Sequence, residues 1–100
     1  VVMMTLAVYE ELILKKVLRR IESEEGVLFM GVLARGEKRE VTLIRGTGLH
    51  MDLGEVVRTM LQSVEGRGGG RGAMARFATT KEHAPQLLPL LMRSIRPPSE

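Results

Sequence analysis

The chain has 100 residues, the length of one ordinary domain with a single hydrophobic core. Because it contains no cysteine, a disulfide framework, a zinc finger, an iron–sulfur cluster and a thiol nucleophile are excluded, and a cytoplasmic location is expected. The formal net charge is +3, arginine outnumbers lysine 11 to 4, and no apolar run approaches the ~20 residues of a membrane-spanning helix, so the composition favours a polyanionic partner and no membrane.

The first expected element is a helix over residues 5–23, within an N-terminal segment of residues 1–25. We expect its apolar stripe to pack against the core of the domain. The stripe is also wide enough for a dimerisation surface, so a homodimer is an open alternative. The apolar side chains that recur at helical spacing are Leu6, Tyr9, Ile13, Val17 and Ile21.

A β-hairpin is expected next. Residues 27–34 form a short apolar run bounded by turn residues, and residues 40–45 form a second, β-branched segment. The four residues between them, Arg35-Gly36-Glu37-Lys38, have the composition of a turn, so the second segment can pair back on the first. The sequence therefore predicts two antiparallel strands.

A second helix and a glycine-rich loop are expected after the hairpin. Asp52 and Glu55 have the spacing of a capping box, with Asp52 accepting from first-turn amides and Glu55 reaching back, which predicts a helix over residues 53–64. Glycine then occupies five of the seven positions 66–72, which ends the helix and gives the backbone access to positive φ.

The end of the chain predicts one more strand and one more helix. Residues 73–80 resume as a strand, and the leucine-rich residues 87–95 predict a third helix with Pro89 in its first turn. The order of elements is α-β-β-α-β-α, with no internal repeat and no long linker. This pattern predicts an α+β (mixed α/β) fold, in which residues 1–100 form a single small domain with helices packed on a mixed sheet.

Side chains for catalysis or metal binding are scarce. Asp52 is the only aspartate, and the two histidines, His50 and His83, lie far apart with no acidic or cysteine cluster at ligand spacing. No serine stands in the Gly-x-Ser-x-Gly turn of a hydrolase. We therefore expect no metal site, no cofactor and no enzymatic activity; phosphoester hydrolysis in particular would need metal ligands that the sequence lacks.

One segment, from Gly66 to Arg76, carries a candidate binding site. Successive glycines let backbone N–H groups converge on an anion, and the arginines at positions 67, 71 and 76 can add charge-assisted hydrogen bonds to phosphate. Two other interpretations stay open: glycine-rich stretches are also typical of flexible linkers, and a thermophilic or GC-rich genome also favours arginine. His50 either contacts a phosphate or base beside this segment or caps the loop before the second helix.

Two motifs occur in a fixed order here: Leu49-His50 with Gly54-Glu55-Val56-Val57, and then Gly68-Gly69-Gly70-Arg71-Gly72-Ala73-Met74-Ala75. Together they resemble the DHH-associated domain, which is found at the C-terminus of alanyl-tRNA synthetases, in AlaX deacylases and in DHH (RecJ-like) phosphoesterases. The resemblance covers residues 27–96. It implies binding of tRNA or other structured RNA, or of single-stranded DNA, and a catalytic partner chain or domain.

The sequence thus predicts a non-catalytic nucleic-acid-binding module. The alternative is an interaction or dimerisation module that docks onto a synthetase, a deacylase or a RecJ-like replication or repair complex. The two differ in salt dependence, because only phosphate binding releases counterions. The residues expected to bind nucleic acid are Arg67, Gly68, Gly69, Gly70, Arg71, Arg76, His50 and Arg45.

Overall fold

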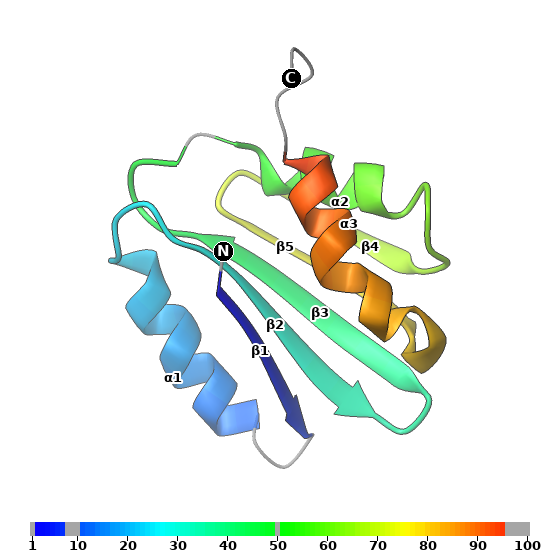
Figure 1. The fold of residues 1–100 in the computed structure, drawn as a ribbon. Coiled ribbons are helices and arrows are strands. Elements are labelled where there is room, and N and C mark those ends of the chain that lie inside the picture. Colours follow the sequence, from blue (N-terminus) through cyan, green and yellow to red (C-terminus); the bar gives the residue numbers. More distant parts are fainter. Residues whose placement is uncertain (1, 8–10, 50, 96–100) are drawn as a thin grey trace.

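The fold is a five-stranded sheet with helices packed on both of its faces (Figure 1). The computed structural model describes residues 2–7, 11–49 and 51–95. Along the chain the elements are β1 (Val2–Ala7), α1 (Glu11–Glu22), β2 (Leu28–Arg35), β3 (Lys38–Arg45), α2 (Leu53–Met60), β4 (Arg67–Arg71), β5 (Met74–Thr80), the 3-10 helix η2 (Lys81–Gln86) and α3 (Leu87–Ser94).

The strands follow the order β1-β2-β3-β5-β4 across the sheet. β1 runs parallel to β2, and α1 forms the crossover between them, whereas every other neighbouring pair is antiparallel. Two short turns close the hairpins β2–β3 and β4–β5, and each begins with a glycine in the left-handed region, Gly36 at φ 57° and Gly72 at φ 66°. Residues that carry a side chain rarely adopt this backbone conformation, so glycine is required at both positions.

α1 covers one face of the sheet, and α2 with α3 covers the other (Figure 1). Leu14 of α1 packs on Phe29 and Ile44 in a small buried cluster. Alternate residues of the same strands, such as Met30, point to the opposite face and form the main core with α2 and α3. α1 does not cover the whole of its face of the sheet. Arg76 on that face is exposed, although β5 is not an edge strand.

The α+β class and the mixed sheet expected from the sequence are confirmed, as are the β2–β3 hairpin, β5 and the helices α2 and α3, although α2 ends at Met60, four residues before the predicted end. The expected N-terminal helix over residues 5–23 is wrong in its first part. Residues Val2–Ala7 form β1, and α1 begins only at Glu11. Leu6, assigned to the helical stripe, instead pairs with Leu33 in the parallel register. Tyr9 lies outside the described residues.

The expected loop over residues 66–72 is also wrong. Residues Arg67–Arg71 form β4, which pairs antiparallel with β5 at the edge of the sheet. Glycine is disfavoured in strands because of its backbone entropy, but here it is selected by close packing of the neighbouring backbone. The segment therefore has one defined conformation, and the flexible-linker interpretation fails.

Candidate nucleic-acid interface

Two glycines of β4 allow the strand to lie against β5. A Cβ atom on Gly68 would be 2.1 Å from the carbonyl oxygen of Arg76 and 2.3 Å from Cα of Phe77, and one on Gly70 would be 2.5 Å from the carbonyl oxygen of Met74. Real Cβ atoms essentially never approach other atoms within 3.0 Å. A side chain at either position would therefore force β4 away from β5.

The first turn of α2 packs directly on the backbone of β4. A Cβ atom on Gly54 would be 2.0 Å from the carbonyl oxygen of Gly70 and 3.2 Å from Cα of Arg71. Gly69 is different, because a Cβ atom there would meet nothing within 4 Å. One face of β4 is therefore packed against the first turn of α2, and the other face, on which Gly69 lies, is open.

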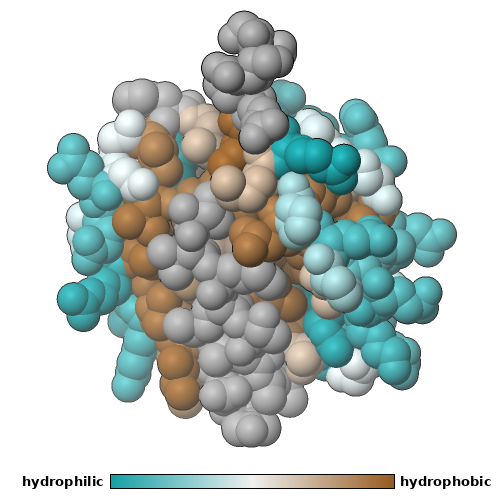
Figure 2. Space-filling model, in the orientation of Figure 1, coloured by the Kyte–Doolittle hydropathy of each residue, from teal (hydrophilic) through white to brown (hydrophobic). Residues whose placement is uncertain are grey.

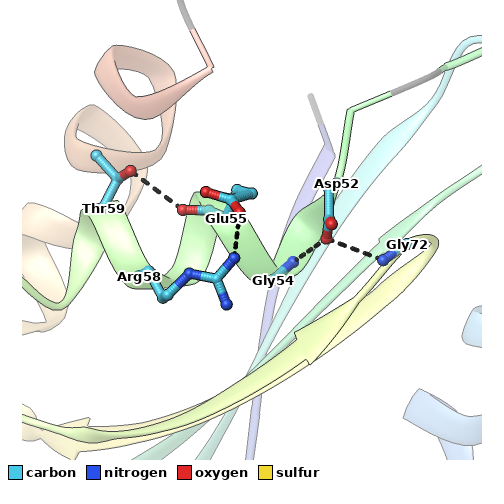
Figure 3. Close-up of polar contacts among 6 residues, drawn as sticks. All are labelled: Asp52, Gly54, Glu55, Arg58, Thr59 and Gly72. Atoms are coloured by element: carbon cyan, nitrogen blue, oxygen red, sulfur yellow. Dashed lines mark hydrogen bonds and ion pairs between the residues drawn. The ribbon is translucent and has the colours of Figure 1, made fainter.

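Asp52 ties the start of α2 to the β4–β5 turn (Figure 3). Its Oδ1 accepts hydrogen bonds from the backbone N–H groups of Gly54 and Gly72, each at 2.9 Å. These bonds, that from Gly72 first, hold the pKa of Asp52 below its ordinary value of 3.8. Asp52 is therefore the expected helix cap, but Glu55 does not complete the capping box, since its carboxylate pairs with Arg58.

The three arginines of the glycine-rich segment share one face of the sheet. Arg67 and Arg71 alternate with Gly68 and Gly70 along β4, and Arg76 of β5 lies opposite Gly69, midway between them. All three side chains are exposed. Within the part of the chain that the structure describes, none of the three guanidinium groups forms an ion pair. Their charges are therefore available to an anion.

A hollow of about 480 Å³ lies between α1 and β4, over β3 and β5. Leu14 and Lys15 line it from the helix, Arg67 and Gly68 line it from β4, and Thr42 and Arg76 contribute to its floor. Glu40 is the acidic residue among the described ones that line it, and its carboxylate forms an ion pair with Arg35. The hollow thus presents unpaired positive charge.

One of the predicted site residues that the structure describes, Arg45, stands apart from this face. Arg45 shares its side of the sheet with Leu28 of the main core, and its Nε donates to the carbonyl oxygen of Gly72 at 3.2 Å. The guanidinium group also donates to the carbonyl oxygen of Leu49. Arg45 therefore braces the β4–β5 turn from behind. His50 lies outside the described residues.

The structure adds three residues that the sequence did not single out. Lys15 and Thr42 line the hollow, and Lys38 lines an adjoining hollow of about 370 Å³ that shares Arg67 with the first. Lys38 and Thr42 belong to a hairpin that the sequence predicts. Their common face with Arg76 follows only from the pairing of β3 with β5, which links distant parts of the chain.

Neither a metal centre nor a membrane span is found in the described residues. No group of three His, Asp or Glu side chains in residues 2–7, 11–49 and 51–95 could hold a metal ion. Among the helices described, none is both long and apolar enough to cross a bilayer.

Comparison with known proteins gives one family and one fold. The family model described as "DHHA1 domain" matches residues 1–96. No curated protein matches the chain. The crystal structure of the C-Ala domain from Aquifex aeolicus alanyl-tRNA synthetase is similar with a TM-score of 0.77, at 16% sequence identity, over 94% of this chain and 88% of that one. At this identity the likeness concerns the fold alone.

Proposed function

Because the chain belongs to the DHHA1 domain family, we propose that it is a non-catalytic module that binds nucleic acid through the open face of β3, β5 and β4. The ligand is tRNA or another structured RNA, or single-stranded DNA. The fold similarity to a domain of an alanyl-tRNA synthetase supports the RNA side of this proposal. The domain would work in the cytoplasm, beside a catalytic or editing partner.

The observation that carries the proposal is the position of Arg67, Arg71 and Arg76 on one exposed face. Guanidinium groups bind phosphate oxygens through two parallel hydrogen bonds, and unpaired ones do so without first breaking an ion pair. Gly69 lies between them and puts no side chain in the way of a ligand. A phosphodiester backbone can thus approach the sheet closely.

Fluorescence anisotropy with a tRNA, a single-stranded DNA and a duplex tests the proposal. If about four phosphates are neutralised, log K against log salt has a slope near −3 on single strands. Replacing Arg67, Arg71 and Arg76 together by alanine should abolish most of the binding. The matched control replaces Arg58 and Arg93 of α2 and α3, which cover the opposite face, and should bind as the parent does. Absence of binding to every probe would contradict the proposal.

One observation favours the alternative of an interaction or dimerisation module. Leu12 and Ile13 of α1 are 71% and 50% exposed, and hydrophobic side chains gather over α1 at the left of Figure 2. Exposed apolar residues side by side are typical of contact surfaces. Association through them would be nearly independent of salt, so sedimentation at low and moderate salt, with Leu12→Ser and Ile13→Ser variants, separates the two functions.

A further inference from the structure

We propose that the ligand lies as one phosphodiester strand along Lys38, Arg67, Arg76 and Arg71, against Lys15 of α1, and that the domain therefore prefers single-stranded nucleic acid to a duplex. The proposal rests on the proposed function and specifies the form of the ligand. We call these four cations with Lys15 the cation track. It includes two lysines that no motif in the sequence points to.

The pairing register places one cation in each of four successive rows on this face. Lys38 lies opposite Thr80 in the first row, and Arg67 lies opposite Ala78 in the second. In the third row Arg76 lies opposite Gly69, and in the fourth Arg71 lies opposite Met74. Met74 packs against the cluster beneath α1, so these rows lie on the face of the sheet that α1 partly covers. Rows on one face are two residues apart, or about 6.8 Å.

This spacing matches the repeat of a single strand. Steps of about 6.8 Å are close to the distance between successive phosphates of an extended polynucleotide. Four rows cover about 20 Å of the sheet, enough for about four phosphates. One cation then meets each phosphate, and the strand runs parallel to β4.

The width of the open face excludes a duplex from the same position. From β3 across β5 to β4 is two strand spacings, or about 10 Å. α1 forms a wall on one side, because Leu14 and Lys15 line the hollow. A duplex, whose two grooves alone measure about 12 and 6 Å across, cannot enter this strip deeply enough to reach Lys15. Contact with Lys15 therefore distinguishes a single strand from a duplex.

Among the residues that the structure describes, the track offers phosphate contacts but no aromatic stacking platform. Proteins that read or grip bases of single strands usually stack them on exposed aromatic rings. Both phenylalanines, Phe29 and Phe77, are buried in the core at 0% and 3% exposure. Bases in the track thus face solvent, and we expect affinities for oligo-dT, oligo-dC and oligo-U of equal length to agree within a few-fold.

The test compares Lys15→Ala with Lys16→Ala. Both lysines are exposed on α1 and carry the same charge, but only Lys15 lines the hollow. The 100-residue chain is titrated by anisotropy with labelled oligo-dT and with a duplex of the same number of phosphates, over a range of salt. We expect tighter binding of oligo-dT. Lys15→Ala and Lys38→Ala should each make its salt slope less negative by about 0.7, whereas Lys16→Ala should leave the slope unchanged.

The outcomes separate this proposal from the proposed function. If the duplex binds as tightly as oligo-dT, or if Lys15→Ala behaves like Lys16→Ala, the single-strand track is refuted, while binding that depends on the three arginines would remain. If no nucleic acid binds at any salt, both proposals fail. Thermal melting of each variant checks that the exposed substitutions leave the fold intact.

Discussion

Substitution of Gly68 by alanine should unfold the domain at a much lower temperature, whereas the same change at the adjacent Gly69 should not. A Cβ atom on Gly68 would be 2.1 Å from the carbonyl oxygen of Arg76 and 2.5 Å from Cβ of Phe77. The atoms it meets belong to the backbone and first side-chain carbon of β5, so they cannot rotate away. Overpacking costs typically 1–3 kcal/mol, and here we expect about 3 kcal/mol or more.

Gly69→Ala is the matched control, because it adds the same methyl group one residue further along β4. The new Cβ atom meets nothing within 4 Å, and φ of Gly69 is not in the left-handed region. Reduced entropy of the unfolded chain should raise stability by up to about 1 kcal/mol. For a domain of this size, 1 kcal/mol shifts Tm by about 4–8 °C. The measurement is Tm by circular dichroism, with a fall of at least about 12–24 °C expected for Gly68→Ala. Equal losses in both variants would show that β4 is not paired as described.

Three further predictions concern the turn, the charge and the core. Asp52→Asn should remove the part of the stability that depends on acidic pH. Folding lowers the pKa of Asp52 below 3.8, so its carboxylate stabilises the fold above that pH. This stabilisation is lost as the pH falls through the folded-state pKa. Tm measured from neutral to strongly acidic pH should thus depend less on pH in the variant. Glu65→Gln should tighten binding of oligo-dT at low salt, because Glu65 lines the hollow beside Lys38 and repels phosphate there; unchanged affinity in anisotropy would place the ligand elsewhere. Leu91→Ala should cost about 2–5 kcal/mol in urea unfolding, since Leu91 is 0% exposed in the main core; a smaller loss would mean that α3 packs loosely.

Local patterns were sufficient to predict the β2–β3 hairpin and the starts of α2 and α3. The β2–β3 hairpin was predictable because its apolar run and its Gly36 turn are both local features. Asp52 marked the start of α2, and Pro89 marked the first turn of α3, because caps and prolines act within one turn of a helix. Each of these elements is encoded within a few residues of itself.

Two strands depend on distant partners and were missed for that reason. β1 is apolar apart from Thr5 and shows no alternation of apolar and polar residues, as is common in parallel strands, so its Leu6 also fitted the helical spacing of the residues that follow. β4 has the composition of a loop, and its glycines make sense only once Gly54 and β5 are seen beside it. The composition of a segment indicates the conformation it prefers in isolation, but in β4 packing against neighbouring elements overrides that preference.

The candidate site divides in the same way. The arginines of the glycine-rich segment stand close together in the sequence, so they could be named in advance. Lys15 and Lys38 could not, because α1 and β3 reach the hollow through the tertiary fold. Arg45 was named from its charge alone, but its hydrogen bonds to the carbonyl oxygens of Gly72 and Leu49 follow from the sheet register.

Because Gly54 of α2 lies directly on Gly70, only the backbone of β4 separates the first turn of α2 from the opposite face of the sheet. The cation track lies on one face of β4, and the first turn of α2 lies on the other face. An anion that binds to β4 and stabilises it should therefore also stabilise α2, although α2 itself does not contact the anion. Hydrogen exchange in α2 would therefore slow when an anion binds, although the helix lies on the far side of the sheet from the cation track.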